Sequence, residues 1–334
     1  MWKVCLQNKK MISVIIPVYK VEDFIVRCAN SLMQQTMEEV EFIFVDDATP
    51  DNSIGVLKDC LQQYPERQGQ IIILRHEKNQ GLPAARNTGL KVATGEYIYH
   101  CDSDDFLEPE ALEVMYETAK AQDADIVWCD WFLSFVKNER YMKQPCYTTT
   151  HEALKGILNG RMKYNVWNKM VKRTLYADND IWFPTGYGMG EDMTLIRLFA
   201  CAEKVAYVPR AFYHYVKLNG GAFTNTFSDR HLKDVLYNTE LTVAFLEAKC
   251  GQDVKAAIAA FKLTVKYPFL ISDNYHMYRL WRTCFPEVNH AVSSVEGQSL
   301  RSRVLQWAAF HGQFWLLWLH YKLVYKLVYG VIYK

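Results

Sequence analysis

The sequence has almost no net charge and no low-complexity stretch. Its 334 residues carry 38 Lys and Arg against 37 Asp and Glu, a formal charge of +1. DNA- and RNA-binding chains usually show a basic balance or a basic stripe, so nucleic acid is not an expected partner. Half of the residues are hydrophobic and 22% are charged, which excludes a disordered or collagen-like chain.

Paired cysteines and a secretory leader are also lacking. The nine cysteines are scattered, odd in number and form no CxxC motif, so neither a disulfide framework nor a zinc site is indicated. The first ten residues contain no apolar segment typical of a secretory signal. These features favour a reducing, cytoplasmic environment.

Two common nucleotide-binding motifs are missing as well. No GxGxxG follows the first predicted strand, and no GxxxxGK(S/T) occurs anywhere in the chain. A dinucleotide site of the first kind is therefore not expected, and a P-loop is excluded. Any bound nucleoside diphosphate must be held by side chains and a metal ion instead of a glycine-rich loop.

Strand-like and helix-like patterns alternate over residues 12–130. Ile12–Val18 is a short, nearly continuous apolar run, typical of a strand buried on both faces. Further strands are predicted at Phe42–Val45, Ile71–Leu74, Tyr97–Cys101 and Ile126–Cys129, with helices at 22–35, 52–63, 83–93 and 109–122. Repeated β-α units predict an α/β fold, with a mostly parallel sheet flanked by helices on both faces.

The periodicity divides the chain into regions. From 131 to about 228 short elements alternate with Gly, Asn and Pro turns, and helical spacing returns at 229. We therefore expect a first domain over 1–228, made of the halves 12–130 and 131–228. A helical C-terminal region should follow over 229–334.

Acidic residues collect directly after predicted strands. Asp46-Asp47 follows the second strand and Asp102-Ser-Asp-Asp105 the fourth, at the edge where open parallel sheets bind ligands. For Asp46-Asp47 and the following Asp51-Asn-Ser53, the alternative is a turn and a helix N-cap. If the later cluster is extended, Asp102 and Asp104 point to the same side. Their carboxylates would favour Mn²⁺ or Mg²⁺, with a diphosphate and water completing the coordination.

Five segments in order carry a family resemblance: Ser13–Tyr19, Val45–Ser53, Asn79–Gly89, Gly95–Ile98 and Asp102–Asp105. This pattern resembles the N-terminal half of family 2 inverting glycosyltransferases, which have the GT-A (nucleotide-diphospho-sugar transferase, Rossmann-like) fold. The resemblance implies metal-dependent transfer of a sugar from a nucleotide-diphospho-sugar, with UDP as the expected nucleotide. The acceptor would be a hydroxyl of a growing cell-surface polysaccharide or of a lipid-linked glycan.

The resemblance also assigns roles to residues of the nucleotide-sugar-binding half, 12–130. The nucleoside pocket would be lined by Pro17, Tyr19, Glu22 and Asp47. Within it, Asp47 would bond the uracil and Tyr19 would pack on the ring. Arg86 would face the nucleotide, and Asp102 would reach the ribose or the metal. Asp104 would ligate the metal directly, as part of the family's DxD motif.

The acceptor half, 131–228, contains Trp167–Met170 and Gly190–Met193, which resemble downstream motifs of the same family. There an acid supplies the base that takes the acceptor's proton. The resemblance implies Asp192 in that role, with Glu191 as the second choice; the alternative is that both acids only begin a helix. Relatives place groups against the diphosphate in the region of His214, Lys217 and Thr224-Asn225. For His214 the alternative is a packed histidine.

The tail, residues 304–334, differs in composition. Residues 304–321 contain no Asp, Glu, Lys or Arg but three Trp, and interleaved Tyr and Lys follow. Such a composition is typical of a helix lying in the membrane interface, which predicts a peripheral membrane anchor. The alternatives are a tail packed on its own domain and a spanning helix.

Two other functions fit part of the pattern. A sugar-phosphate nucleotidyltransferase would need a glycine-rich basic loop after the first strand, where Pro17-Val-Tyr19 stands. A membrane-associated, non-catalytic scaffold with a nucleotide pocket would not need to keep Asp47, Asp102, Asp104 and Asp192. A metal-dependent glycosyltransferase is therefore the leading hypothesis.

Overall fold

The computed structural model of the chain describes residues 10–217, 228–295 and 298–324. These residues form two compact units. The first runs to Ala153 and resumes over Tyr164–Asn238, and the second comprises Leu154–Lys163 and the chain from Thr239 onward. The boundary predicted at 228 falls just before helix α8 (Asp229–Cys250), whereas the two units divide within that helix.

A nine-stranded sheet organises the first unit, in the order β3-β2-β1-β4-β8-β6-β9-β5 with β7 paired to β6. The strands are β1 (Ile12–Val18), β2 (Val40–Asp46), β3 (Ile71–Arg75), β4 (Tyr97–His100), β5 (Phe106–Leu107), β6 (Ile126–Ser134), β7 (Glu139–Met142), β8 (Lys169–Lys172) and β9 (Val205–Val216). Strands β3, β2, β1 and β4 are parallel. Beyond them the sheet is mixed, because β8 runs antiparallel to both β4 and β6. The prediction of an α/β fold with a mostly parallel sheet is confirmed, because β6 and β9 also pair parallel to each other and only β5, β7 and β8 run antiparallel to their neighbours.

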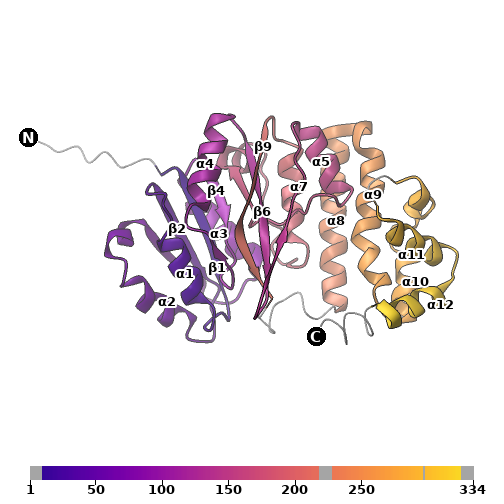
Figure 1. The fold of residues 1–334 in the computed structure, drawn as a ribbon, viewed down its shortest axis with the longest axis horizontal. Coiled ribbons are helices and arrows are strands. Elements are labelled where there is room, and N and C mark those ends of the chain that lie inside the picture. The colour runs from indigo at the N-terminus through magenta and orange to yellow at the C-terminus, as the bar shows by residue number, and fades with distance from the viewer. Residues whose placement is uncertain (1–9, 218–227, 296–297, 325–334) are drawn as a thin grey trace, which may run out of the picture. The chain divides into compact units, whose positions relative to one another are not determined.

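The first four strands form as their sequence predicts. Every residue of β1 and β2 is buried, which matches the continuous apolar runs. The helices of this region are α1 (Ile25–Met33), α2 (Ser53–Leu61), α3 (Leu82–Val92) and α4 (Ala111–Ala121). Figure 1 shows α1, α3 and α4 alongside the strands that they contact. Because β1 and β2 pair Val18 with Asp46, their carboxyl ends lie together at one edge.

The rest of the first unit consists of shorter elements. They are part of α5 (Thr150–Leu158), α6 (Arg173–Asp178), the 3-10 helix η2 (Glu191–Met193), α7 (Thr194–Phe199) and the beginning of α8. Gly190, which has a φ of +88°, turns the chain into η2 in a conformation that glycine adopts readily. Glu191 and Asp192 do therefore begin a helix, and this alternative describes the backbone correctly.

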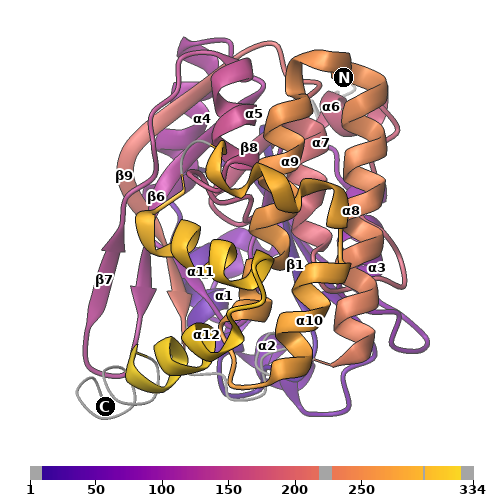
Figure 2. The same cartoon turned by 90° about the vertical axis from the view of Figure 1, so that its right-hand side faces the viewer.

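The second unit is helical. It contains the rest of α8, α9 (Lys255–Lys266), α10 (Tyr275–Thr283), α11 (Leu300–Phe310) and α12 (Phe314–His320), and Figure 2 shows the last three next to one another. Lys266 is fully buried and donates to the carbonyls of Cys284 and Phe285 at 2.9 and 3.2 Å. These carbonyls follow the end of α10, where backbone acceptors lack partners within the helix.

The tail is interrupted where its sequence suggested one long apolar helix. Helix α11 ends at Phe310, Gly312 has a φ of +72°, and α12 begins at Phe314. Leu305 and Leu317 are buried, so part of the tail packs within its own unit. Within 10–217, 228–295 and 298–324, none of the helices combines the length and apolarity that crossing a membrane requires. Residues 325–334 lie outside the described residues.

Candidate active site

The acidic turn, residues Asp102–Asp105, follows β4. The backbone N–H of Asp105 donates to the carbonyl of Asp102 at 3.1 Å. The predicted extended conformation is therefore wrong, because this bond folds the segment into a turn. Asp102 and Asp104 remain partly exposed, whereas Asp105 is fully buried.

Asp105 has a structural role that its sequence position does not reveal. Its carboxylate accepts hydrogen bonds from the hydroxyl of Tyr213 at 2.6 Å and from the backbone N–H of Val216 at 2.7 Å. Burial raises the pKa of Asp105 well above its usual range, and the charges of Asp104 and Asp102 add to the effect. The third acid of the cluster thus fastens β9 to the turn.

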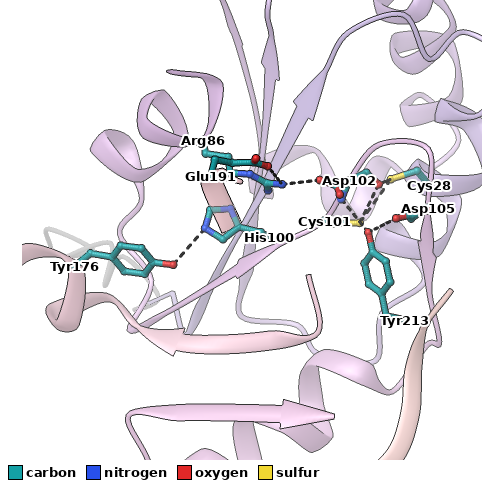
Figure 3. Close-up of polar contacts among 9 residues, drawn as sticks. All are labelled: Cys28, Arg86, His100, Cys101, Asp102, Asp105, Tyr176, Glu191 and Tyr213. Atoms are coloured by element: carbon teal, nitrogen blue, oxygen red, sulfur yellow. Dashed lines mark hydrogen bonds and ion pairs between the residues drawn. The ribbon is translucent and has the colours of Figure 1, made fainter. Parts of the chain in front are cut away.

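Arg86, on α3, links the acidic turn to the acid pair of the second half (Figure 3). Its Nη2 donates to Asp102 Oδ1 at 2.9 Å and lies 3.9 Å from Glu191 Oε1. Burial alone would lower the pKa of Arg86, but the carboxylates of Asp102, Asp192 and Glu191 raise it above its ordinary value. The side chain is 1% exposed, and its Nε and Nη1 have no partner among the described residues. A charged guanidinium with two such N–H groups is suited to hold an anionic ligand.

The acid pair consists of Glu191 and Asp192, and the pKa of each carboxyl group is raised. Burial raises the pKa of Asp192 to about 6, although the charges of Arg86 and Lys169 oppose that rise. Burial and the neighbouring charge of Asp192 raise the pKa of Glu191 well above its usual range. A pKa near the working pH is what a general base needs. The buried Oδ1 of Asp192 has no partner among the described residues.

The chain that leads to the acid pair is fastened on both sides. On α3, Asn87 accepts from the backbone N–H of Phe183 at 2.9 Å and donates to its carbonyl at 2.8 Å. On α8, Asn238 donates to the carbonyls of Tyr187 and Met189 at 3.1 and 3.0 Å. The acid pair is therefore carried by a segment with fixed ends, and sequence reasoning assigned a role to neither asparagine.

The residues predicted to line the nucleoside pocket lie at the carboxyl ends of β1 and β2 or just after them, but their surroundings differ. Pro17 is buried within β1, and Tyr19 is 41% exposed. Glu22 accepts from the backbone N–H of Asn52 at 2.9 Å. Tyr19 and Glu22 are therefore exposed, whereas Pro17 is buried.

Asp47 is buried and has several protein partners. It accepts from the backbone N–H groups of Gln80 and Gly81, both at 2.8 Å, and lies 2.6 Å from His76 Nδ1. This carboxylate holds the loop that leads into α3, the helix of Arg86. The sequence reasoning did not single out His76, although it directly follows β3.

His214 is a packed histidine, the alternative weighed for it. Its two ring nitrogens lie 2.7 Å from Glu139 and 2.9 Å from Glu108. The rings of Phe106 and Phe132 stack on the imidazole at 4.1 and 4.7 Å. Thr224 and Asn225, predicted near the diphosphate, lie outside the described residues.

A family model described as Glycosyl transferase family 2 matches residues 13–187. The chain belongs to this family. The matched span includes the residues predicted in the nucleotide-sugar-binding half, from Pro17 to Asp104, and ends before Glu191 and Asp192.

Known glycosyltransferases resemble this one over most of its length. The putative glycosyltransferase EpsH of Bacillus subtilis (strain 168) is 29% identical over 244 residues, which cover 71% of this chain and 69% of that protein. The cholesterol galactosyltransferase of Borreliella burgdorferi is 28% identical over 313 residues, which cover 87% and 85%. A crystal structure of S. aureus TarS 1–349 in complex with UDP-GlcNAc has a TM-score of 0.70 at 19% identity, covering 93% of this chain and 91% of that one. The GT-A fold of this glycosyltransferase is thereby confirmed.

A divalent cation fits the donor side of this glycosyltransferase. Asp102 and Asp104 offer hard carboxylate oxygens from one partly exposed turn, the ligand type that Mg²⁺ and Mn²⁺ favour. No group of three or more His, Cys, Asp or Glu side chains suited to a metal ion occurs in the described part of the chain. A cation here would therefore need oxygens of a diphosphate and of water to complete its coordination.

Proposed function

We propose that this glycosyltransferase moves a sugar from a UDP-sugar to an acceptor hydroxyl in a metal-dependent reaction that inverts the anomeric carbon. The observation that carries the proposal is the meeting of two acid groups at one buried arginine. Arg86 bonds Asp102 at 2.9 Å and approaches Glu191 at 3.9 Å. Donor-side and acceptor-side acids, distant in sequence, therefore border one place where a sugar could be transferred.

On the donor side, Asp104 and Asp102 would hold Mn²⁺ or Mg²⁺ with the diphosphate. Tyr19 would pack on the base, with Pro17, Glu22 and Asp47 around it. When bound, the metal neutralises the charge that grows on the departing diphosphate. Arg86 would add a fixed positive charge through its two unpartnered N–H groups. That the TarS structure is a complex with UDP-GlcNAc supports a UDP-linked donor.

On the acceptor side, Asp192 would take the proton of the acceptor hydroxyl as its oxygen attacks the anomeric carbon. The transition state of glycosyl transfer resembles an oxocarbenium ion, so the carboxylate would also favour the positive charge that develops there. Burial and the charge of Asp192 raise the pKa of Glu191 well above its usual range, which favours Asp192 as the single base. One base and one displacement invert the configuration.

The experiment that tests this function is a panel of nucleotide-sugars incubated with the purified chain and Mn²⁺. Many transferases hydrolyse their donor slowly when the acceptor is missing. We therefore expect the correct donor to release UDP, and we expect this release to stop when EDTA removes the metal ion. If UDP binds but no nucleotide-sugar is hydrolysed, the non-catalytic scaffold with a nucleotide pocket becomes the better interpretation.

We also propose that the acceptor is met at a membrane, with the enzyme peripheral on its cytoplasmic face. No Asp or Glu follows Glu296, whereas basic residues continue to the end of the chain as Arg301, Arg303, Lys322, Lys326 and Lys334. In the same segment Trp307, Trp315 and Trp318 are 50%, 57% and 40% exposed. Exposed tryptophans beside basic groups suit the headgroup region of an anionic bilayer. A relative named for transfer to cholesterol supports a lipid-borne or membrane-held acceptor.

Replacing Trp315 and Trp318 together with Ala should lower binding to anionic vesicles by about tenfold or more, because both rings would leave the interface. Flotation with phosphatidylserine-containing vesicles measures this. Trp182→Ala is the matched control, since Trp182 is 39% exposed but belongs to the first unit. Truncation at residue 304 would be less informative, because it would also remove the buried Leu305 and Leu317. Equal flotation of the double variant and the wild type would contradict the membrane proposal.

A further inference from the structure

The hydroxyl of Tyr213, in β9, reaches both ends of the acidic turn. It donates to Asp105 Oδ2 at 2.6 Å and accepts from the backbone N–H of Asp102 at 3.1 Å (Figure 3). The side chain is fully buried. The turn is thus stabilised in two ways. Its own backbone hydrogen bond joins Asp105 to Asp102, and the Tyr213 hydroxyl hydrogen-bonds both of these residues. Buried groups whose bonds are satisfied in one arrangement hold their partners rigidly.

The ring of Tyr213 is itself held in place. Trp167 stacks on it with ring centroids 4.4 Å apart and an interplanar angle of 15°. Trp131 closes on Trp167 edge-on at 5.0 Å. Because Trp167 is only 5% exposed, the tyrosine ring has no room to swing its hydroxyl away from the acidic turn.

Trp167 belongs to a second turn, Val166–Lys169, which touches the base. The backbone N–H of Lys169 donates to the carbonyl of Val166 at 3.3 Å, and the backbone of Val166 hydrogen-bonds the carboxylate of Asp192. The buried Nζ of Lys169 fixes this turn, since it donates to the Asn165 carbonyl at 2.9 Å and to Asn168 Oδ1 at 2.8 Å. One short segment therefore supports Tyr213 through Trp167 and contacts the proposed base, Asp192, through Val166.

We infer that Tyr213 is a positioning residue that sets the direction of Asp102 and Asp104 before the donor binds, with Trp167 as its support. It acts through these two acids and does not touch the reacting atoms. The inference rests on the proposed function, in which both acids hold the metal and the diphosphate. A preformed turn avoids the cost of ordering those ligands when the donor arrives.

The test compares Tyr213→Phe with Tyr215→Phe. Both changes remove one hydroxyl from β9, and both rings stack on Trp167, Tyr215 at 5.4 Å and 9°. Only the Tyr213 hydroxyl is bonded to the acidic turn. Calorimetric titration with UDP should show an affinity about tenfold weaker for Tyr213→Phe when Mn²⁺ is present, and nearly unchanged without Mn²⁺. Tyr215→Phe should match the wild type in both titrations.

A second measurement needs neither metal nor nucleotide. Hydrogen exchange at the amide of Asp102 should become faster in Tyr213→Phe, because this N–H loses the oxygen that accepts its bond. If Tyr213→Phe only lowers the melting temperature and keeps both the wild-type UDP affinity with Mn²⁺ and the wild-type exchange at Asp102, the positioning role is overturned. If instead the wild type itself shows no Mn²⁺-dependent UDP binding, the proposed function fails, and the exchange result still decides whether the hydroxyl orders the turn.

Discussion

Replacing Asp192 with Asn is expected to lower turnover by about 10²-fold or more and to leave UDP binding unchanged. The amide has nearly the same size as the carboxylate but cannot take a proton from the acceptor. Steady-state kinetics with the donor found in the hydrolysis panel, together with calorimetry of UDP binding, measure the two effects separately.

Glu191→Gln is the matched control for this change. Glu191 is the neighbouring acid, whose pKa is raised well above its usual range by burial and by the charge of Asp192, and its change to Gln likewise replaces a carboxyl group with an amide of nearly the same size. Its turnover should stay much closer to that of the wild type. If Asp192→Asn loses UDP binding as strongly as turnover, Asp192 belongs to the donor site and is not the base.

The wild-type enzyme should also lose turnover as the pH falls through about 6. Burial raises the pKa of Asp192 to about 6, so the carboxylate is ionised above that pH and protonated below it. A protonated acid cannot act as the base, and the loss should therefore lie on the acidic side. A pH–rate profile that stays flat between pH 5 and 7 would argue against Asp192 in this role.

Asp104→Asn is expected to abolish Mn²⁺-dependent UDP binding while the chain stays folded. Asp104 is partly exposed at the acidic turn, and Asn has nearly the same size, so the substitution leaves no cavity. The amide is uncharged, however, and cannot balance the charge of a cation. Calorimetry with UDP and Mn²⁺ measures the binding, and thermal unfolding checks the fold. Asp123→Asn is a control of equal charge change, at an acid that is 73% exposed and paired with Lys204. Wild-type affinity in Asp104→Asn would remove this residue from the metal site.

The first four strands could be predicted because they depend on local patterns. An apolar run such as Ile12–Val18 requires burial on both faces wherever it is placed, and β-α units order themselves by short right-handed connections. The beginning of β6 could also be predicted, from the apolar run Ile126–Cys129, but β5, β7, β8 and β9 follow no such local rule. Strand β8, only four residues long, joins β4 to β6 across the sheet, and nothing in Lys169–Lys172 itself indicates those two partners.

The candidate site could likewise be predicted only in part from the sequence. The sequence predicts an acidic cluster after β4, but its three Asp side chains are chemically identical until a fold separates them. Burial and the bonds from Tyr213 and Val216 make Asp105 structural, and both partners come from a strand more than a hundred residues further on. The contact of Arg86 with Glu191 likewise depends on packing between distant segments. Residue types and spacing could suggest the chemistry, whereas tertiary contacts determine which acid has a structural role and which acids face a ligand.

Strand β5 (Phe106–Leu107) comes early in the chain but lies at the far edge of the sheet, where it pairs with β9. Between it and β4 stand β8, β6 and β9, two of which are made after residue 168. During synthesis the ribosome must therefore release about a hundred further residues before the acidic turn, which lies between β4 and β5, has both of its flanking strands in place. Until then, the nascent N-terminal half would have unpaired strand edges. We therefore expect it to bind chaperones, and we expect it to be a poor choice for expression as a separate fragment.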